Sequence, residues 1–237
     1  MLPYKNVQAR PRISKVLADF ARVSLSQFGE DIVLGEYLLQ GRLSTKARYI
    51  DLGCFHPLKW SNTALLHFIG WRGLNIDANA EMIQNFHIQR PEDRSVCAGI
   101  ASAEGMFDFY HIGVGASSTI DVAHKDHRQS KGAPVHRKTE LSCFPIMQLL
   151  TSNISAEELK QCEYIDIDLE GLDEIVVEQI DWSWLTVKLV TVEIHVQTVP
   201  EVLDSKIYKV MTAQGFRLEH YVQATAFFYR DQSAEQL

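Results

Sequence analysis

The 237-residue chain is predicted to fold as an α/β domain around a mostly parallel β-sheet. Short apolar strands alternate with amphipathic helices along most of the sequence, which is the pattern of parallel strands joined by crossover helices. Several of these strands end in an acidic residue, most clearly at Asp51, Asp77 and Asp168. Near the C-terminus two strands follow each other across a short turn, which predicts an antiparallel hairpin at the edge of the sheet.

Composition and charge narrow the classes of function. The net charge of −7 excludes a protein that holds nucleic acid through a broad basic surface. No apolar run approaches the ~20 residues of a membrane span, and the N-terminus lacks the apolar core of a secretion signal. Four cysteines without a CxxC pair suit free thiols. We therefore expect a cytoplasmic protein that does not bind nucleic acid, with homo-oligomerisation left open.

The domain organisation is expected to be simple, with an N-terminal arm and helix over residues 1–25 and a single domain over residues 26–237. A second helix is predicted to begin near Gln27 or Gly29 and to end at Gly41, with Ser26 as its cap. Its apolar residues at helical spacing are Ile32, Val33, Tyr37 and Leu38. Gln27, Glu30 and Asp31 then cluster just before the first strand, either to cap the helix or to contact a ligand.

The segment 49–79 contains the first unit of the sheet. An apolar strand ends on Asp51, a turn with Gly53 follows, a helix is predicted over 60–69, and a second strand ends on Asp77. Two parallel strands joined by a helix, each ending in a carboxylate, form half of a nucleotide-type crevice. The carboxylate of Asp77 is suited to accept hydrogen bonds from both hydroxyls of a ribose.

The middle of the chain is predicted to contain strands and helices around one irregular segment. We expect a helix over 80–89, strands over 95–100, 104–112 and 139–143, and a helix over 144–150. Residues 113–138 are expected to form a mobile lid without regular structure. The histidines in this segment, His124, His127 and His136, have no acidic or thiol partner at ligand spacing, so no metal site is expected there.

The C-terminal half carries the second acidic stretch. A capping box at Ser155–Glu158 starts a helix, and a strand over 164–168 follows. Asp166, Asp168 and Glu170 repel one another unless a cation lies among them. The next helix is predicted to bury Leu172, Ile175, Val176 and Ile180. A strand over 187–195 then ends in Glu193 and His195, and a helix over 200–211 precedes the hairpin 215–219 and 225–230.

Five segments carry a resemblance to a known family: residues 26–31 (SQFGED), 49–63, 70–79, 98–102 and 167–173. In this order they resemble the FkbM family of S-adenosylmethionine-dependent methyltransferases. The resemblance implies a Rossmann-like class I methyltransferase fold, with a seven-stranded sheet, helices on both faces and the C-terminal hairpin. The sequence departs from the general methyltransferase pattern because GxGxG is absent around Gly53. Asp166 is one carboxylate more than the family's strand usually carries.

The resemblance also implies roles for individual residues. Those expected to bind S-adenosylmethionine are Gln27, Glu30, Asp51, Gly53, His56, Asn62, Asp77, Asn79, Ala98, Gly99 and Ser102. Asp166, Asp168 and Glu170 are expected to face the substrate. Methylation of a hydroxyl requires a base, and the candidates are Asp168, Glu193 and His195. Alternatively, a divalent cation such as Mg²⁺, held by Asp168 and Glu193, lowers the pKa of the hydroxyl.

The predicted activity is O-methylation of a sugar, as a glycan or a glycosylated metabolite, or of another secondary metabolite. Two alternatives stay open. A non-catalytic Rossmann-like binding module would keep the fold without turnover. A nucleotide-sugar or dinucleotide oxidoreductase would bind NAD(P), although the glycines that cradle its phosphates are missing.

Overall fold

The computed structural model describes residues 23–113 and 115–231. Most of the arm and helix expected over residues 1–25 lie outside the described residues. The division of the chain into that arm and one domain therefore stays a prediction.

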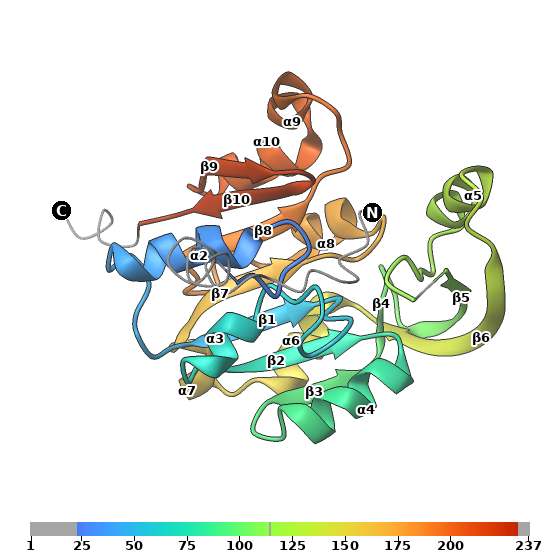
Figure 1. Cartoon of the computed structure of the whole chain (residues 1–237), viewed down its shortest axis with the longest axis horizontal. Helices are drawn as coiled ribbons and strands as arrows, with labels where there is room; N and C mark the ends of the chain where they lie inside the picture. Colours follow the sequence, from blue (N-terminus) through green and yellow to red (C-terminus); the bar gives the residue numbers. More distant parts are fainter. Residues whose placement is uncertain (1–22, 114, 232–237) are drawn as a thin grey trace, which may run out of the picture.

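A seven-stranded sheet forms the centre of the protein, as predicted (Figure 1). Five neighbouring strands are parallel, whereas the last two pair antiparallel and form the expected C-terminal hairpin. In spatial order the strands are β3 (Arg94–Cys97), β2 (Arg72–Asp77), β1 (Arg48–Leu52), β7 (Cys162–Ile167), β8 (Leu189–Glu193), β10 (Thr225–Tyr229) and β9 (Arg217–Val222). The strand order reverses between β1 and β7, which is where open α/β sheets bind ligands.

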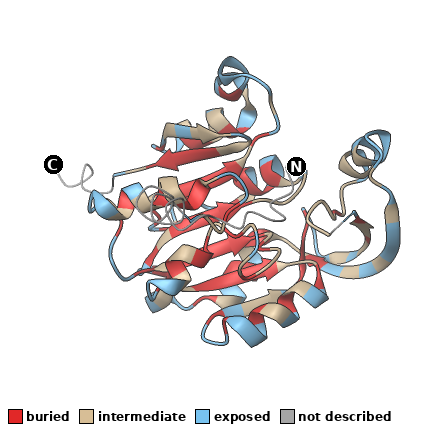
Figure 2. Cartoon of the chain, viewed as in Figure 1, coloured by how far each residue is buried: buried red, intermediate tan, exposed pale blue. Residues whose placement is uncertain are grey.

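Helices cover both faces of the sheet. One apolar cluster joins the strands to α2 (Glu30–Leu39) and α3 (Ala64–Phe68). The cluster on the other face includes residues of α6 (Ile146–Asn153), α8 (Asp173–Gln179) and α10 (Lys206–Ala213). Figure 2 shows the strands buried between these layers. The remaining helices of the main body are α4 (Ala80–Gln89), α7 (Ala156–Leu159) and α9 (Val199–Asp204). None of the described helices has the length and apolar character needed to cross a bilayer.

Several helices differ from their predicted lengths or faces. The helix expected over 60–69 begins only at Ala64, because Trp60 has φ 57° and cannot lie in a right-handed helix. The helix expected over 200–211 is divided by Ser205, which is extended and whose hydroxyl accepts a hydrogen bond from the Tyr208 amide. In α8 the predicted Ile175 is exposed, and Val177 is buried instead.

Residues 99–144 build an arm beside the main sheet (Figure 1). It contains a three-stranded sheet of β4 (Gly99–Ile100), β6 (Val135–Phe144) and β5 (Gly105–Ile112), together with α5 (Val122–Ser130). The prediction of an irregular segment over 113–138 was therefore wrong. None of the residues of α5 is buried. Its sequence therefore lacks the regular spacing of apolar residues from which a helix is predicted. Most of β6 is exposed or half-buried, and its order comes from long-range pairing with β5.

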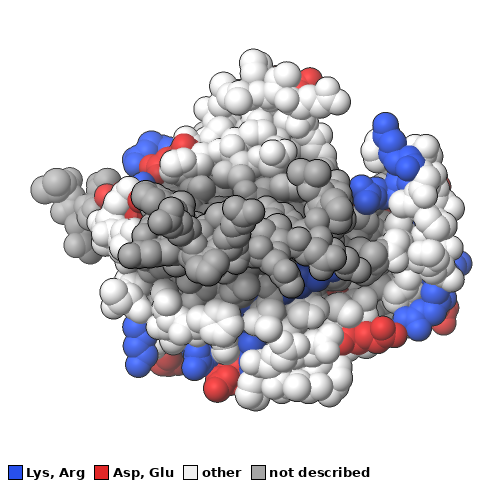
Figure 3. Space-filling model, viewed as in Figure 1, with Lys and Arg blue, Asp and Glu red and all other residues white. Residues whose placement is uncertain are grey.

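Lysine and arginine side chains gather on this arm, as Figure 3 shows. The segment 125–138 supplies five cations to a chain whose net charge is −7: Lys125, Arg128, Lys131, Arg137 and Lys138. The arm therefore carries a local group of basic side chains in an acidic chain.

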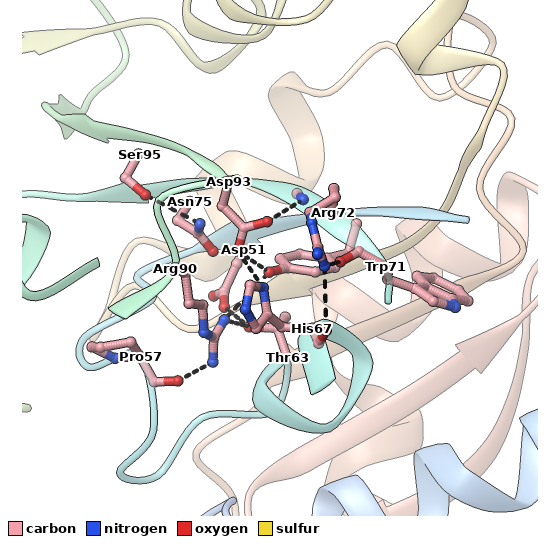
Figure 4. A network of polar contacts seen from close by, with 12 residues as sticks. Asp51, Pro57, Thr63, His67, Trp71, Arg72, Asn75, Arg90, Asp93 and Ser95 are labelled. Atoms are coloured by element: carbon pink, nitrogen blue, oxygen red, sulfur yellow. Dashed lines mark hydrogen bonds and ion pairs between the residues drawn. The ribbon is translucent and has the colours of Figure 1, made fainter. Parts of the chain in front are cut away.

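A buried arginine holds the first strand to the loop that follows it (Figure 4). Arg90, at the end of α4, is 1% exposed. Its guanidinium donates to the hydroxyls of Tyr49, Ser61 and Thr63 and to the carbonyl of Pro57. The Thr63 hydroxyl in turn donates to Asp51. One cation thus organises the loop between β1 and α3, which carries much of the site described below.

We predict that Arg90→Met lowers the free energy of unfolding by about 3 kcal/mol or more, because several buried oxygens lose their donor. Urea unfolding measures this change. The control is Arg94→Met, an exposed arginine that pairs with Glu158 at 3.7 Å and should cost less than about 1 kcal/mol. Equal losses in the two variants would contradict a special role for the Arg90 network.

Candidate active site

The parallel register places polar side chains in two rows on one face of the sheet. Asp51 of β1 is paired with Asp166 of β7, and Asp166 is paired with Thr191 of β8. Side chains alternate along a strand, so the residues two positions later point to the same face. That second row lies at the carboxyl ends of the strands and contains Gly53, Asp77, Asp168 and Glu193. The predicted acids thus lie along one edge of one sheet.

The first row contains two neighbouring buried carboxylates. Asp51 is 2% exposed and accepts a hydrogen bond from Thr63, and Asp166 is 5% exposed and accepts from Thr191 and Asn62. Burial, followed by the charge of Asp166, raises the pKa of Asp51 to about 8. Burial also raises the pKa of Asp166 to about 6. The two acids are therefore costly to ionise together without a cation.

The first of three adjoining cavities lies beside Asp77. The two oxygens of this carboxylate accept hydrogen bonds from the amides of Phe55 and Asn79, at 2.8 and 2.6 Å, which fixes its orientation. Burial raises the pKa of Asp77 to about 6. Small and apolar residues form the walls around it: Ile76, Ala98, Gly99, Ile100, Phe109 and Leu172. The cavity thus combines small and apolar walls with the oriented carboxylate of Asp77, and Asp168 and Glu170 also line it.

The second cavity lies over the two polar rows. Its lining includes Gln27, Asp51, Gly53, Asn62, Asp166 and Asp168. Gly53 has φ 85°, and a Cβ there would lie 1.8 Å from the Asp168 carbonyl oxygen, so this position requires glycine. The Asp168 Oδ1 atom is buried and has no hydrogen-bond partner among the described residues. Burial, and then the charge of Glu193, raises the pKa of Asp168 well above its usual range.

The third cavity opens beyond the sheet edge and shares Trp60, Glu170 and Glu193 with the second. Glu193 Oε2 lies 2.8 Å from His195 Nε2, and this contact raises the pKa of the histidine. The lining also includes several polar side chains: Gln27, which it shares with the second cavity, and Ser117, Arg128, Gln197 and Gln223. Such a surface offers hydrogen-bond partners to a hydroxylated molecule.

Four residues expected at the cofactor have other contacts. Glu30 is buried and accepts from the Phe28 amide, whereas Ser102 is exposed. His56 Nδ1 accepts from two backbone amides of its own loop. Asn79 caps α4 by accepting from the Glu81 amide. None of the four is among the residues that line the three cavities described here, and their roles at a cofactor stay predictions.

The structure also brings residues to the site that the sequence did not single out. Phe55 and Trp60 both have positive φ and stack with ring centroids 5.9 Å apart, forming a wall common to the cavities. Thr191 supports Asp166 from the neighbouring strand. His124 of the arm lies 3.1 Å from Glu170. Of these residues, only Thr191 could have been identified from the sequence, because it stands two positions before Glu193 on one strand.

Comparison with known protein families identifies the family of the chain. The model of the methyltransferase FkbM domain matches residues 47–218, and the chain belongs to this family. The seven-stranded fold and the family define an S-adenosylmethionine-dependent methyltransferase, as the motifs predicted.

A TehB-like SAM-dependent methyltransferase from Corynebacterium glutamicum is similar in structure, with a TM-score of 0.40, 13% identity, and coverage of 93% of this chain and 95% of that one. A similarity this low indicates nothing about the substrate of the present chain. No curated protein matches the sequence.

We predict that the protein without cofactor loses stability as pH rises from 6.5 to 8. The pKa of Asp51 is raised in the folded state, so protonation stabilises the fold at low pH and this stabilisation is lost as pH rises through about 8. The loss is about 2 kcal/mol, or ~4–8 °C in Tm. Thermal melts should show a smaller fall in Asp51→Asn, whose amide can still accept from Thr63. An equal fall in both proteins would contradict the raised pKa.

Proposed function

We propose that the protein transfers a methyl group from S-adenosylmethionine to a hydroxyl oxygen of a sugar or a similar polyhydroxylated metabolite. The observation that supports this most is the continuity of the three cavities. An apolar slot with an oriented carboxylate leads through an acidic chamber into a polar cavity, with Glu170 and Glu193 at the last boundary.

The residues present suit this cofactor. The slot between Ile76 and Ile100 has the small and apolar walls that an adenine ring needs, and Asp77 lies where it can accept from ribose hydroxyls. The unpaired Asp168 oxygen and the neighbouring acids suit a ligand that carries an ammonium and a sulfonium. A cationic ligand would relieve the repulsion between Asp51 and Asp166 as well.

The acceptor would be oriented in the third cavity, with a hydroxyl directed at the second. Glu193 lines both cavities and would take the hydroxyl proton, while His195 at 2.8 Å would share that charge. As the O–H bond breaks, the oxygen forms its bond to the methyl carbon and the methyl–sulfur bond of the cofactor breaks. Asp168, Phe55 and Trp60 would exclude water and hold the two reactants in line.

The amide and carboxylate groups of the third cavity favour a sugar hydroxyl over an apolar acceptor. Gln27, Gln197 and Gln223 can each both donate and accept hydrogen bonds, as neighbouring hydroxyls require. Arg128 in the same lining would favour an acceptor that also carries an anionic group.

We expect cofactor-free protein to bind S-adenosylhomocysteine at one site per chain in isothermal titration. Asp77→Ala should weaken binding by about tenfold or more, because a charged acceptor for two hydroxyls is lost. The matched control is Asp108→Ala, which removes an exposed aspartate that pairs with Lys138 and should leave affinity unchanged. Unaltered binding in Asp77→Ala would move the ribose contact elsewhere, and an absence of binding to the wild type would remove the proposal.

Glu193→Gln should lower turnover about 100-fold while S-adenosylhomocysteine affinity stays within about threefold, since a positioned base contributes at least that factor. Release of S-adenosylhomocysteine in the presence of a panel of sugars and glycosides measures turnover. Full turnover in Glu193→Gln would exclude this residue as the base. Release that needs no acceptor would indicate hydrolysis instead of transfer.

A further inference from the structure

Three side chains that can bind a metal lie together beside the third cavity, and two of them, Glu170 and His195, line it. His124 comes from α5, Glu170 from the loop after β7, and His195 from the segment after β8. One ring nitrogen of each histidine and a carboxylate oxygen of Glu170 lie within 4.8 Å of one another. Segments separated by up to 71 positions thus direct two imidazoles and one carboxylate to a common point.

Hydrogen bonding does not account for this arrangement. The His124 side chain is 9% exposed, and its Nε2 lies 3.1 Å from Glu170 Oε2. Yet this nitrogen makes no hydrogen bond within the described part of the chain. A buried imidazole nitrogen without a partner is costly. Two ligands of one ion approach each other in this manner, because each directs its lone pair at the ion between them.

The backbone holds the three groups in place. Glu170 has φ 50°, an uncommon conformation for a residue with a side chain, and its carbonyl accepts from the Thr119 hydroxyl. Gly171 packs so closely on the arm that a Cβ there would lie 3.0 Å from His124 Cβ. Asp173 accepts from the amides of Leu169 and Gly171 and fixes the same turn. These contacts fix the turn that carries Glu170 and its packing against His124.

The surrounding charge favours a cation. Glu193 lies 2.8 Å from His195, and Asp168 lines the adjoining chamber. Arg128, which lines the same third cavity, is the opposing positive charge. Two neutral histidines and a carboxylate carry one negative charge, which a divalent ion more than offsets.

We propose that His124, Glu170 and His195 bind one divalent first-row transition-metal ion beside the acceptor cavity. Imidazole and carboxylate ligands suit Mn²⁺, Fe²⁺, Co²⁺ or Zn²⁺ better than Mg²⁺, which prefers oxygen ligands. Three protein ligands leave open positions on the ion. This set differs from the pair Asp168 and Glu193 expected from the sequence. Of the three histidines of the arm, for which the sequence predicted no metal site, it includes only His124.

The role of the ion rests on the proposed function. An acceptor hydroxyl that enters an open position has its pKa lowered by the ion. The proton then passes to Glu193, the oxygen bonds to the methyl carbon, and the methyl–sulfur bond breaks. In this arrangement His195 is a ligand and Glu193 alone is the base. The ion would also tie the arm to the main sheet, because His124 is its one ligand from residues 99–144.

Titration of metal-depleted, untagged full-length protein with Co²⁺ tests the site. Calorimetry should give one ion per chain, and the visible absorption of Co²⁺ should show nitrogen ligands. His124→Ala and Glu170→Gln should each weaken binding by about tenfold or more, as expected when one of three ligands is lost. The matched control is His127→Ala, which removes an exposed histidine of the same helix and should bind Co²⁺ as the wild type does.

Either of two results would overturn the proposal: no stoichiometric binding by the wild type, or equal affinity in the wild type, His124→Ala and Glu170→Gln. Circular dichroism confirms that each variant is folded, and Glu170→Gln serves if His124→Ala is not. The same metal-free samples are titrated with S-adenosylhomocysteine. Binding of the cofactor product without binding of Co²⁺ rejects the metal site alone, whereas loss of cofactor binding rejects the methyltransferase proposal itself.

Discussion

The structure depends on one constraint, the register that places the buried carboxylates of Asp51 and Asp166 side by side on adjacent parallel strands. Two such acids cannot both ionise in a buried position without compensation. The protein supplies part of it through neutral donors, because Thr63 supports Asp51, and Thr191 with Asn62 supports Asp166. Arg90 contributes further by donating a hydrogen bond to the Thr63 hydroxyl and holding it in place. The compensation is still incomplete, so a positively charged ligand is favoured on the side of the acids where the cavities lie.

The same register explains why the functional groups share one edge. Residues two positions apart on a strand point to the same face, so Asp51 and Gly53 both point to the face covered by α2 and α3. The same relation holds between Asp166 and Asp168 on β7 and between Thr191 and Glu193 on β8. A buried supporting row thus precedes an accessible row on each strand. The arm of residues 99–144 then encloses the space above, since Phe109 and Thr119 line the first cavity.

The sequence was sufficient for the parts of the fold that local patterns determine. The parallel strands, their acidic ends and the closing hairpin follow from apolar runs and turn residues, and the motifs around Gly53 and Asp77 indicated the family. What it missed depends on contacts between distant segments. The exposed strand β6 acquires its order from β5, and α5 is a helix without a buried face. His124 had no ligand partner nearby in sequence, because Glu170 and His195 reach it only across the folded arm.

The central claim is that one small cationic cofactor is bound along the carboxyl edge of β1, β2 and β7, where both polar rows end. A crystal structure with S-adenosylhomocysteine tests it most directly. The account predicts the ribose hydroxyls within hydrogen-bond distance of Asp77, the adenine between Ile76 and Ile100, and the sulfur beside Asp168 and facing Glu193. A ligand bound at the opposite edge of the sheet, or one that leaves Asp77 without a contact, would contradict it.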